Sequence, residues 1–358
     1  MEEKRTRREF LGDAAALGAG AWLLGACGRS AGAAASAVAN MSGVRPSIDN
    51  AGIQLYTVRD RMTSDFEGTL AQIAGIGYRE VEFVAYGGKS PQEVRAILDR
   101  VGLRAPSTHA ALRPGPDLEQ QLAGYQAMGH KFAAAGGPRR APGGPPIAAP
   151  PDPRAAPPAG AQPNGTPPNG APGGSPNGGP PAGFTPPVPT LDSVQREIAS
   201  WNEIAQAAKP YGIRILVHNH TMEFTLLPDG RTPHDVMLAE LDPSLVVLEL
   251  DIGWSTVAGK DAQALIAAHP GRYPLWHVKD MANLAAVNSN GNDEAARMRA
   301  AKIVPLGQGE IDYGPIFARA GTAGLEHFFV EQDTAPDSGD SIAAARTSFE
   351  ALKQLLRS

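Results

Sequence analysis

The sequence has a single cysteine, few aromatic residues and no excess of basic charge. One cysteine, Cys27, excludes disulfides within the chain, thiolate catalysis in the folded domain and a zinc site built from several thiolates. Aromatic residues make up 6% of the 358 residues, and the formal net charge is −5. Nothing in this composition favours binding to nucleic acid. No glycine-rich phosphate loop follows the first apolar run, which argues against a nucleotide-binding open sheet.

The first 27 residues are predicted to be an export signal. The stretch TRREFL at residues 6–11 resembles a twin-arginine motif, and LGAC at residues 24–27 resembles a bacterial lipobox. The apolar run between them is shorter than the ~20 residues that span a membrane. We therefore expect twin-arginine export, lipidation of Cys27 and a lipid anchor on the periplasmic side of a bacterial membrane. Residues 28–46 are predicted to be a flexible tether.

Residues 47–358 alternate short apolar runs with longer amphipathic patterns. Strands are predicted at 53–56, 81–84, 104–109, 131–135, 213–218, 245–251, 274–279 and 327–331. Helices are predicted at 66–76, 91–101, 118–128, 191–208, 233–240, 261–268, 312–320 and 341–356. Eight strand and helix pairs predict an α/β fold, the (β/α)8 TIM barrel, with a doubly wound open sheet as the alternative.

A low-complexity segment, residues 136–189, interrupts this pattern after the fourth strand. It consists mainly of Pro, Gly, Asn and Ala, with near-repeats of Pro-Asn-Gly. Such a composition buries too little apolar surface to offset the entropy of ordering the chain. We expect a disordered, Pro/Gly-rich insertion on the barrel rim; a lid or a cell-wall contact is the functional alternative.

Four consecutive predicted strands end in polar side chains, and each end includes a histidine or a carboxylate that can bind a metal. They end at His218 and His220, at Asp251, at His277 and Lys279, and at Glu331. The C-terminal ends of barrel strands all face one mouth, where the active sites of this fold lie. Because side chains alternate along a strand, Asp251 shares its face with Glu249, and His277 shares its face with Lys279. The sequence therefore predicts one metal site with nitrogen and oxygen ligands at the mouth.

Several stretches resemble the xylose-isomerase-like barrel superfamily, specifically its sugar phosphate isomerase/epimerase branch. They are GIQLYTVRD (52–60), GYREVEF (77–83), VHNHTMEF (217–224), ELDIGW (249–254), LWHVKD (275–280), VPLGQGEIDY (304–313) and FFVEQD (328–333). The resemblance covers nearly the whole domain outside the insertion. It implies a metal-binding barrel enzyme that acts on a carbohydrate.

The resemblance also implies a ligand set of Glu, Asp, His and Glu from strands five to eight. Asp251, His277 and Glu331 match the last three members. Strand five departs from the pattern, because its tip has two histidines and the nearest glutamate, Glu223, follows them. We expect His220 to be the fourth ligand because it is nearest the mouth, with His218 and Glu223 as alternatives.

Mixed imidazole and carboxylate ligands suit one divalent ion, and ligand type does not choose among Mn²⁺, Mg²⁺, Co²⁺ and Zn²⁺. An ion that chelates two adjacent oxygens of a hydroxy-ketone stabilises the enediolate formed when the proton between them is removed. Glu331 is the expected base on one side, and Glu223 or a strand-five histidine, His218 or His220, the base on the other. Lys279 is predicted to hold a substrate oxygen or steady the enolate, with a structural ion pair as the alternative.

Three further residues are weaker candidates. His109 and Trp254 are predicted to contact the sugar, and a structural role is equally compatible with the position of His109. Glu82 lies within a predicted strand, and we expect an ion pair with a lysine inside the barrel.

The predicted function is a metal-dependent isomerase or epimerase of a non-phosphorylated sugar or keto-sugar. Export and the lack of a Lys/Arg cluster argue against a phosphorylated substrate. One alternative is a lyase, dehydratase or hydratase on keto-glycosides or polyol derivatives, which needs only one competent base. Another is a carbohydrate-binding lipoprotein without catalysis. The expected partners are a small carbohydrate and, through Cys27, a membrane.

Overall fold

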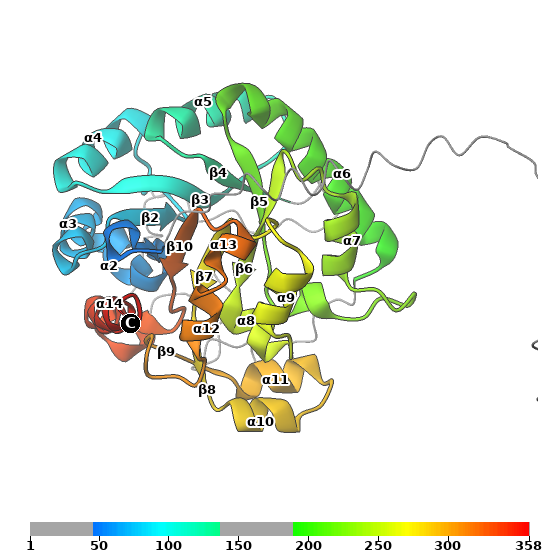
Figure 1. The fold of residues 1–358 in the computed structure, drawn as a ribbon. Helices are drawn as coiled ribbons and strands as arrows, with labels where there is room; N and C mark the ends of the chain where they lie inside the picture. The colour runs from blue at the N-terminus through cyan, green and yellow to red at the C-terminus, as the bar shows by residue number, and fades with distance from the viewer. Residues whose placement is uncertain (1–45, 137–188, 358) are drawn as a thin grey trace, which may run out of the picture. The chain divides into compact units, whose positions relative to one another are not determined.

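Eight parallel strands close into a barrel in the computed structural model, which describes residues 46–136 and 189–357. The strands are β1 (Gly52–Gln54), β2 (Glu80–Phe83), β3 (Arg104–Leu112), β4 (Phe132–Ala135), β5 (Arg214–His218), β6 (Val246–Asp251), β7 (Leu275–Val278) and β10 (His327–Val330). β1 pairs with both β2 and β10, which closes the ring (Figure 1). The TIM barrel prediction is confirmed, and the open sheet is excluded.

Helices surround the barrel (Figure 1). They are α3 (Phe66–Ile76), α4 (Pro91–Val101), α5 (Leu118–Met128), α6 (Leu191–Ala208), α7 (Pro233–Glu240), α9 (Ala262–Ala268), α12 (Tyr313–Phe317), α13 (Ala320–Ala323) and α14 (Ser341–Leu355). α4 begins where predicted, because Ser90 and Glu93 cap its first turn reciprocally. The single helix predicted at 312–320 was wrong. Two short helices occupy this stretch, where Gly314 and Gly321 lower the helix propensity.

Several short elements were not predicted. α2 (Arg59–Ser64) follows β1, and α8 (Ile252–Val257) follows β6 directly. Between β7 and α12 the chain makes an excursion through β8 (Asp280–Ala282), α10 (Leu284–Ser289), α11 (Glu294–Ala300) and β9 (Lys302–Val304). β8 and β9 pair antiparallel. The four elements of the excursion lie together at one side of the barrel (Figure 1). Elements of three to seven residues are too short to show a periodic pattern.

A small apolar cluster and one carboxylate hold this excursion in place. Trp254 and Val257 of α8 pack with Met281 and Ile303 of the β8–β9 sheet. The Asp280 carboxylate accepts hydrogen bonds from the backbone N–H groups of Met281, Gly307, Gly309 and Ile311. The excursion is therefore anchored at the mouth end of β7.

The barrel interior has an apolar layer below a polar one. Phe132, Leu216, Val247, Leu275 and Phe329 form a buried cluster inside the ring. Two residues further along β5, β6, β7 and β10 the same face carries His218, Glu249, His277 and Glu331. The apolar layer closes the floor of the barrel, so that the polar layer opens only toward the mouth.

Residues 1–45, 137–188 and 358 lie outside the described residues. The expected signal and lipobox, almost all of the tether and nearly all of the Pro/Gly-rich insertion fall there, so they stay predictions. The described residues all belong to one unit, Met41–Ser358. Within them, no helix combines the length and the apolar character needed to cross a membrane.

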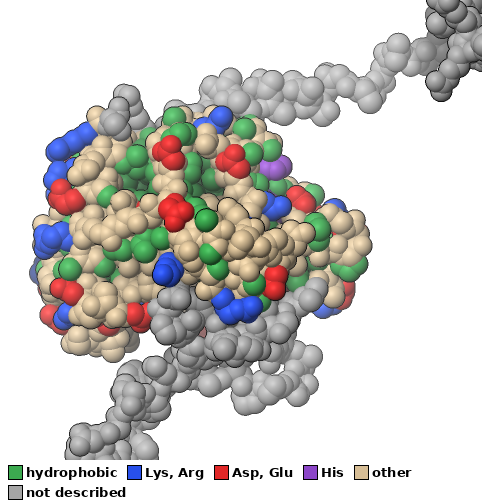
Figure 2. Space-filling view, turned by 90° about the horizontal axis from the view of Figure 1, so that it is seen from below, with side chains coloured by type: hydrophobic (Ala, Val, Ile, Leu, Met, Phe, Trp, Pro, Cys, Tyr) green, Lys and Arg blue, Asp and Glu red, His purple; other side chains and the backbone are tan. Residues whose placement is uncertain are grey.

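The described surface in Figure 2 mixes both signs of charge. Lys and Arg side chains alternate with Asp and Glu across this face, with apolar side chains between them. This face thus shows no single-sign field that would attract a polyanion.

Candidate metal centre

Three predicted ligands meet at the mouth. Asp251, His277 and Glu331 each offer an atom within 4.8 Å of the others, and all three are buried. His277 Nδ1 lies 2.8 Å from Glu331 Oε2 and 3.8 Å from Asp251 Oδ2. These side chains come from the ends of β6, β7 and β10, as the strand alternation requires.

The atoms of this cluster lie close together and make two short ion pairs, His277 Nδ1 with Glu331 Oε2 at 2.8 Å and Asp251 Oδ2 with Lys279 Nζ at 3.0 Å. Asp251 Oδ2 and His277 Nδ1 are buried, and neither makes a hydrogen bond of good geometry within the described part of the chain. Buried polar atoms without such a bond are rare and need an explanation. One imidazole nitrogen and two carboxylate oxygens within 4.8 Å of one another are an arrangement that can hold a cation. The donor set therefore fits a divalent metal ion.

Two deeper carboxylates orient the histidines. His277 Nε2 lies 2.7 Å from Glu82 Oε2, and His218 Nδ1 lies 3.1 Å from Glu249 Oε2. Each ring thus has one nitrogen held by a buried carboxylate while the other nitrogen faces the cluster; His218 Nε2 is 3.7 Å from Asp251 Oδ2. A carboxylate that fixes the ring of a ligating histidine is a recurrent feature of metal sites.

A second group of possible ligand atoms lies beneath the first. It comprises His109, His218, Glu249 and His277. One oxygen of Glu249 joins its members, because Oε2 lies 2.6 Å from His109 Nε2 and 3.1 Å from His218 Nδ1. We therefore assign Glu249 a supporting role beneath the Asp251, His277 and Glu331 cluster.

Lys279 lies among the carboxylates of the mouth. Its Nζ is 3.0 Å from Asp251 Oδ2, 2.9 Å from Glu331 Oε2 and 2.8 Å from Asp333 Oδ2. Burial alone would lower the pKa of this ammonium group, but the three carboxylates outweigh burial and raise the pKa well above its ordinary value. Lys279 is therefore charged, and its contacts agree with the structural ion pair weighed from the sequence.

The site gathers five acidic residues around one lysine. Its acidic residues are Glu82, Glu249, Asp251, Glu331 and Asp333, and Lys279 is the one lysine among them. Burial would lower the pKa of His277, but Glu249, Glu331 and Glu82 outweigh it and raise that pKa well above the usual value. The surroundings thus favour a positive charge at this ring. A proton or a divalent ion supplies one, and the two compete.

Glu82 and Glu331 stay ionised despite their burial. Burial would raise the pKa of Glu82, but His109 and His277 outweigh it and lower the pKa to about 2. Lys279 and His277 likewise lower the pKa of Glu331 well below its ordinary range, although burial opposes this. The lysine partner expected for Glu82 was wrong. Its carboxylate accepts from Gln54 and Ser107 and contacts His277, because Lys279 lies higher, at the mouth.

The other strand-five candidates lie further from the cluster. His220 is exposed, and its ring is 4.8 Å from that of His218. Glu223 turns back to accept a hydrogen bond from the His220 N–H at 2.6 Å, and it lines a small space with His234 and Met237 of α7. Burial raises the pKa of Glu223 to about 7. Neither residue belongs to a cluster of possible ligands, so their predicted ligand and catalytic roles stay predictions.

The mouth itself is a cavity of about 240 Å³. Its lining includes Gln54, Tyr56, His109, His218, His220, His277, Lys279, Glu331 and Asp333. His109, predicted to contact substrate, thus faces the space where a substrate would lie. Trp254 is buried with its ring 5.2 Å from Lys279 Nζ, so that its predicted stacking on a sugar remains untested.

Gly253 allows the start of α8 to pack closely against the end of β7. A Cβ atom at this position would lie 2.6 Å from the Lys279 carbonyl oxygen and 3.0 Å from Lys279 Cβ. The glycine therefore permits α8 to start directly after Asp251 and pack against the end of β7. Asp251 caps this helix through Oδ1, which accepts from the Trp254 N–H at 2.7 Å.

The site residues that were not predicted include Gln54, Ser107, Glu249 and Asp333. Glu249 could have been found, since it lies two residues from Asp251 on the same strand and so shares its face. Asp333 lies beyond the end of β10, where strand alternation no longer applies. Gln54 and Ser107 carry no such signal, because they come from strands without a predicted ligand.

A closed parallel barrel with a cluster of possible metal ligands at its strand ends places the chain among the TIM barrels. The chain belongs to the xylose isomerase-like TIM barrel family, whose model matches residues 171–355. The sequence-based resemblance to this family is thereby confirmed.

Individual relatives are distant. The chain is 29% identical over 159 residues to an inosose dehydratase of Geobacillus thermodenitrificans, an alignment covering 42% of this chain and 51% of that protein. The chain thus spans about half the length of the curated relatives it matches.

Two solved structures share the fold over most of the chain. One is a sugar phosphate isomerase/epimerase from Parabacteroides distasonis, with a TM-score of 0.59, 16% identity and coverage of 86% of this chain and 94% of that one. The other is the IOLI protein with a bound zinc atom, with a TM-score of 0.56, 12% identity and coverage of 86% and 98%. At these identities the likeness concerns the fold alone.

Proposed function

We propose that the protein is a divalent-metal-dependent enzyme that removes a proton beside the carbonyl group of a non-phosphorylated sugar or keto-sugar, giving isomerisation or epimerisation. The observation that carries this proposal is the convergence of Asp251 Oδ2, His277 Nδ1 and Glu331 Oε2 in a buried, acidic mouth. The zinc atom bound by IOLI, a protein of the same fold, supports a metal in a barrel of this kind.

The proposed ligands are Asp251, His277, Glu331 and, as fourth, His218. His218 replaces the expected His220 because its Nε2 faces Asp251 while Glu249 holds its other nitrogen. A divalent ion bound there would stabilise an enediolate by neutralising the charge on two adjacent oxygens. Its identity stays open among Mn²⁺, Mg²⁺, Co²⁺ and Zn²⁺.

The remaining residues orient the sugar and move protons. Glu331 is ionised and lines the cavity, so it is the proposed base on one side. His109 also lines the cavity, and Glu249 holds its Nε2, so that its Nδ1 is the proposed proton carrier on the other side. Lys279 donates to a substrate oxygen in this scheme and keeps Asp251 and Glu331 ionised.

Dehydration is the second candidate. Glu223, expected as the second carboxylate base, does not line the mouth cavity. A site with one carboxylate base can expel a β-leaving group from the same enolate. The similarity to inosose dehydratases also supports this outcome.

Proton exchange in D₂O tests the proposal. The purified protein, loaded with Mn²⁺, should exchange the proton beside the carbonyl of at least one member of a panel of ketoses and keto-glycosides. A product of the same composition would identify an isomerase or epimerase, and loss of water a dehydratase. If sugars bind and no proton exchanges on any of them, the non-catalytic binding protein is the better account.

Glu249→Gln should weaken metal binding by roughly 10- to 100-fold, because the amide no longer orients His218 and His109 as a carboxylate does. Calorimetric titration of each variant with Mn²⁺ measures this change in affinity. Glu80→Gln is the matched control: Glu80 is a buried barrel carboxylate 2.7 Å from His327 Nδ1, at the opposite end of the strands. Equal affinity in both variants would contradict the supporting role of Glu249.

Export and anchoring remain part of the proposal. The twin-arginine and lipobox motifs at residues 6–11 and 24–27 support a periplasmic, lipid-anchored enzyme. A membrane reached through Cys27 and a small carbohydrate are its proposed partners.

A further inference from the structure

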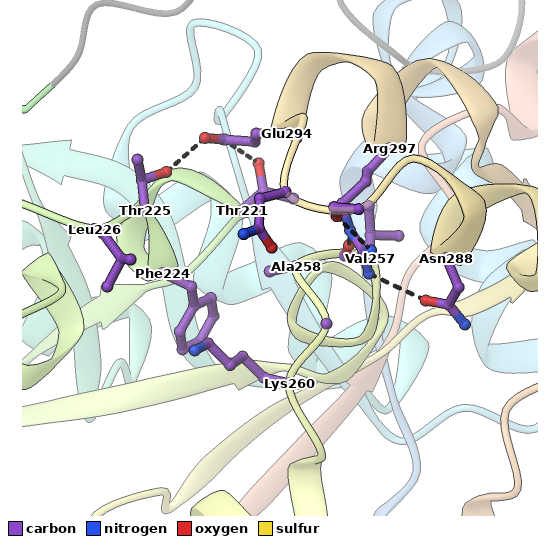
Figure 3. Close-up of a pocket in the computed structure, with 13 residues that line it drawn as sticks. Thr221, Phe224, Thr225, Leu226, Val257, Ala258, Lys260, Asn288, Glu294 and Arg297 are labelled. Carbon is purple, nitrogen blue, oxygen red and sulfur yellow. Dashed lines mark hydrogen bonds between the residues drawn. The ribbon is translucent and has the colours of Figure 1, made fainter.

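A second and larger cavity lies beside the mouth, with a volume of about 690 Å³. Three segments that follow strands of the barrel form its walls: the loop after β5, the end of α8, and the α10–α11 excursion. It is lined by Thr221, Phe224, Thr225, Leu226, Val257, Ala258, Gly259, Lys260, Asn288, Gly291, Asn292, Glu294 and Arg297 (Figure 3).

Hydrogen bonds between distant segments hold these walls in place. Glu294 accepts from Thr221 Oγ1 at 2.7 Å and from Thr225 Oγ1 at 2.5 Å, which joins α11 to the loop after β5. Arg297 donates from Nε to the Val257 carbonyl at 2.6 Å and from Nη2 to Asn288 Oδ1 at 3.2 Å, which joins α11 to α8 and α10. Figure 3 shows both sets of bonds at the cavity wall. The cavity is therefore preformed.

The lining combines apolar surface with hydrogen-bond donors. Leu226 is 65% exposed, and the Phe224 ring lies beneath Lys260, whose Nζ is 5.9 Å from the ring centroid. No described carboxylate lies within ion-pair distance of Lys260, and the side chain of Asn292 is exposed. Apolar patches together with a few polar groups are the usual lining of a ligand site. A sugar ring, with apolar faces and hydroxyl edges, matches this combination.

The linings of the two cavities meet in the sequence at residues 220 and 221. His220 lines the mouth and the next residue, Thr221, lines the second cavity. The mouth, at 240 Å³, is smaller than the roughly 300–1,000 Å³ of typical ligand pockets, whereas the second cavity lies well within that range. The mouth thus has room for the reacting ring and the neighbouring cavity for a further group attached to it.

We propose that the second cavity is a subsite for a sugar ring linked to the ring that reacts at the metal centre. The substrate class would then be a disaccharide or another glycoside rather than a free monosaccharide. This inference rests on the proposed function for the identity of the reacting ring.

Calorimetric titration of the Mn²⁺-loaded protein tests the subsite. D-Fructose provides the reacting ketose alone, whereas maltulose and lactulose carry the same ketose linked to a second ring. At least one disaccharide should bind about tenfold more tightly than D-fructose or better, which corresponds to about 1.4 kcal/mol. Equal affinities, or no binding of either disaccharide, would overturn the subsite.

Variants that fill the second cavity distinguish sugar binding there from sugar binding in the mouth. Ala258→Trp places a large ring in the cavity, and the ratio of disaccharide to D-fructose affinity should fall to about one. Lys260→Ala, which leaves the backbone and the walls unchanged, should lower the ratio in the same direction. Ala285→Trp on the exposed side of α10, outside the lining, is the control and should keep the full ratio. A ratio that survives Ala258→Trp would overturn the assignment to this cavity.

The subsite and the proposed function fail in different ways. If the disaccharide preference depends on Ala258 and Lys260 but no proton exchanges in D₂O, the subsite stands and the enolisation proposal fails. If protons exchange while D-fructose and the disaccharides bind equally, the proposed function stands and the subsite fails.

Discussion

Asp251→Asn should remove the bound metal and abolish proton exchange. Oδ2 of Asp251 is the central acceptor of the cluster, lying 3.7–3.8 Å from nitrogens of His218 and His277. Replacing it with an amide removes one negative charge and one ligand atom. Loss of a residue that only orients a ligand lowers metal affinity by up to about 100-fold, so loss of the ligand Asp251 should lower it by more. The rate of proton exchange should fall by roughly 10²- to 10³-fold.

The choice of asparagine keeps the fold intact. Asp251 Oδ1 caps α8, and the asparagine carbonyl can accept the same hydrogen bond from the Trp254 N–H. Asp261→Asn is the matched control, because Asp261 caps α9 in the same manner and is exposed. Metal analysis and proton-exchange assays on both variants test whether Asp251 is a metal ligand. Full metal occupancy in Asp251→Asn would contradict the ligand assignment.

Lys279→Met should lower the free energy of unfolding by about 3–5 kcal/mol in metal-free protein. Lys279 is 1% exposed, and its removal leaves Asp251, Glu331 and Asp333 close together without their cation. A divalent ion would replace part of the lost charge. Adding Mn²⁺ should therefore stabilise the variant more than it stabilises the unchanged protein.

Urea unfolding with and without Mn²⁺ measures both effects. Lys353→Met is the control, since Lys353 pairs with Glu350 in a solvent-exposed i,i+3 contact of α14. Such pairs contribute about 0–1 kcal/mol. The prediction would be contradicted if Lys279→Met lowered the free energy of unfolding by less than about 1 kcal/mol, or if Mn²⁺ stabilised the variant no more than the unchanged protein. The lysine charge would then not be needed to offset the carboxylates of the mouth.

Much of the fold follows from local patterns in the sequence. The apolar runs of the eight barrel strands lie within three residues of the predicted positions at each end, and the capping box at Ser90 marks the start of α4. The excursion between β7 and α12 could not be found in this way. Its strands have three residues each, and a long-range contact, the Asp280 carboxylate with the N–H groups of residues 307–311, organises it.

The site residues could be predicted where they lie on a strand, because strand alternation then fixes which way their side chains point. Asp251 and His277 lie on inward faces at strand ends, and Glu331 follows directly, so their convergence could be predicted. The distinction between His218 and His220 could not, because β5 ends at His218 and the alternation no longer fixes the side chains beyond it. The contact between Glu82 and His277 joins residues 195 positions apart and depends on closure of the barrel.

Anomalous diffraction from crystals of the protein soaked in Mn²⁺ tests the central claim most directly. We expect one strong peak bounded by Asp251, His277 and Glu331, with His218 as the fourth neighbour, and its loss in crystals of Asp251→Asn. A peak elsewhere, or no peak while Lys279 remains between the same carboxylates, would contradict the metal centre and the function proposed from it.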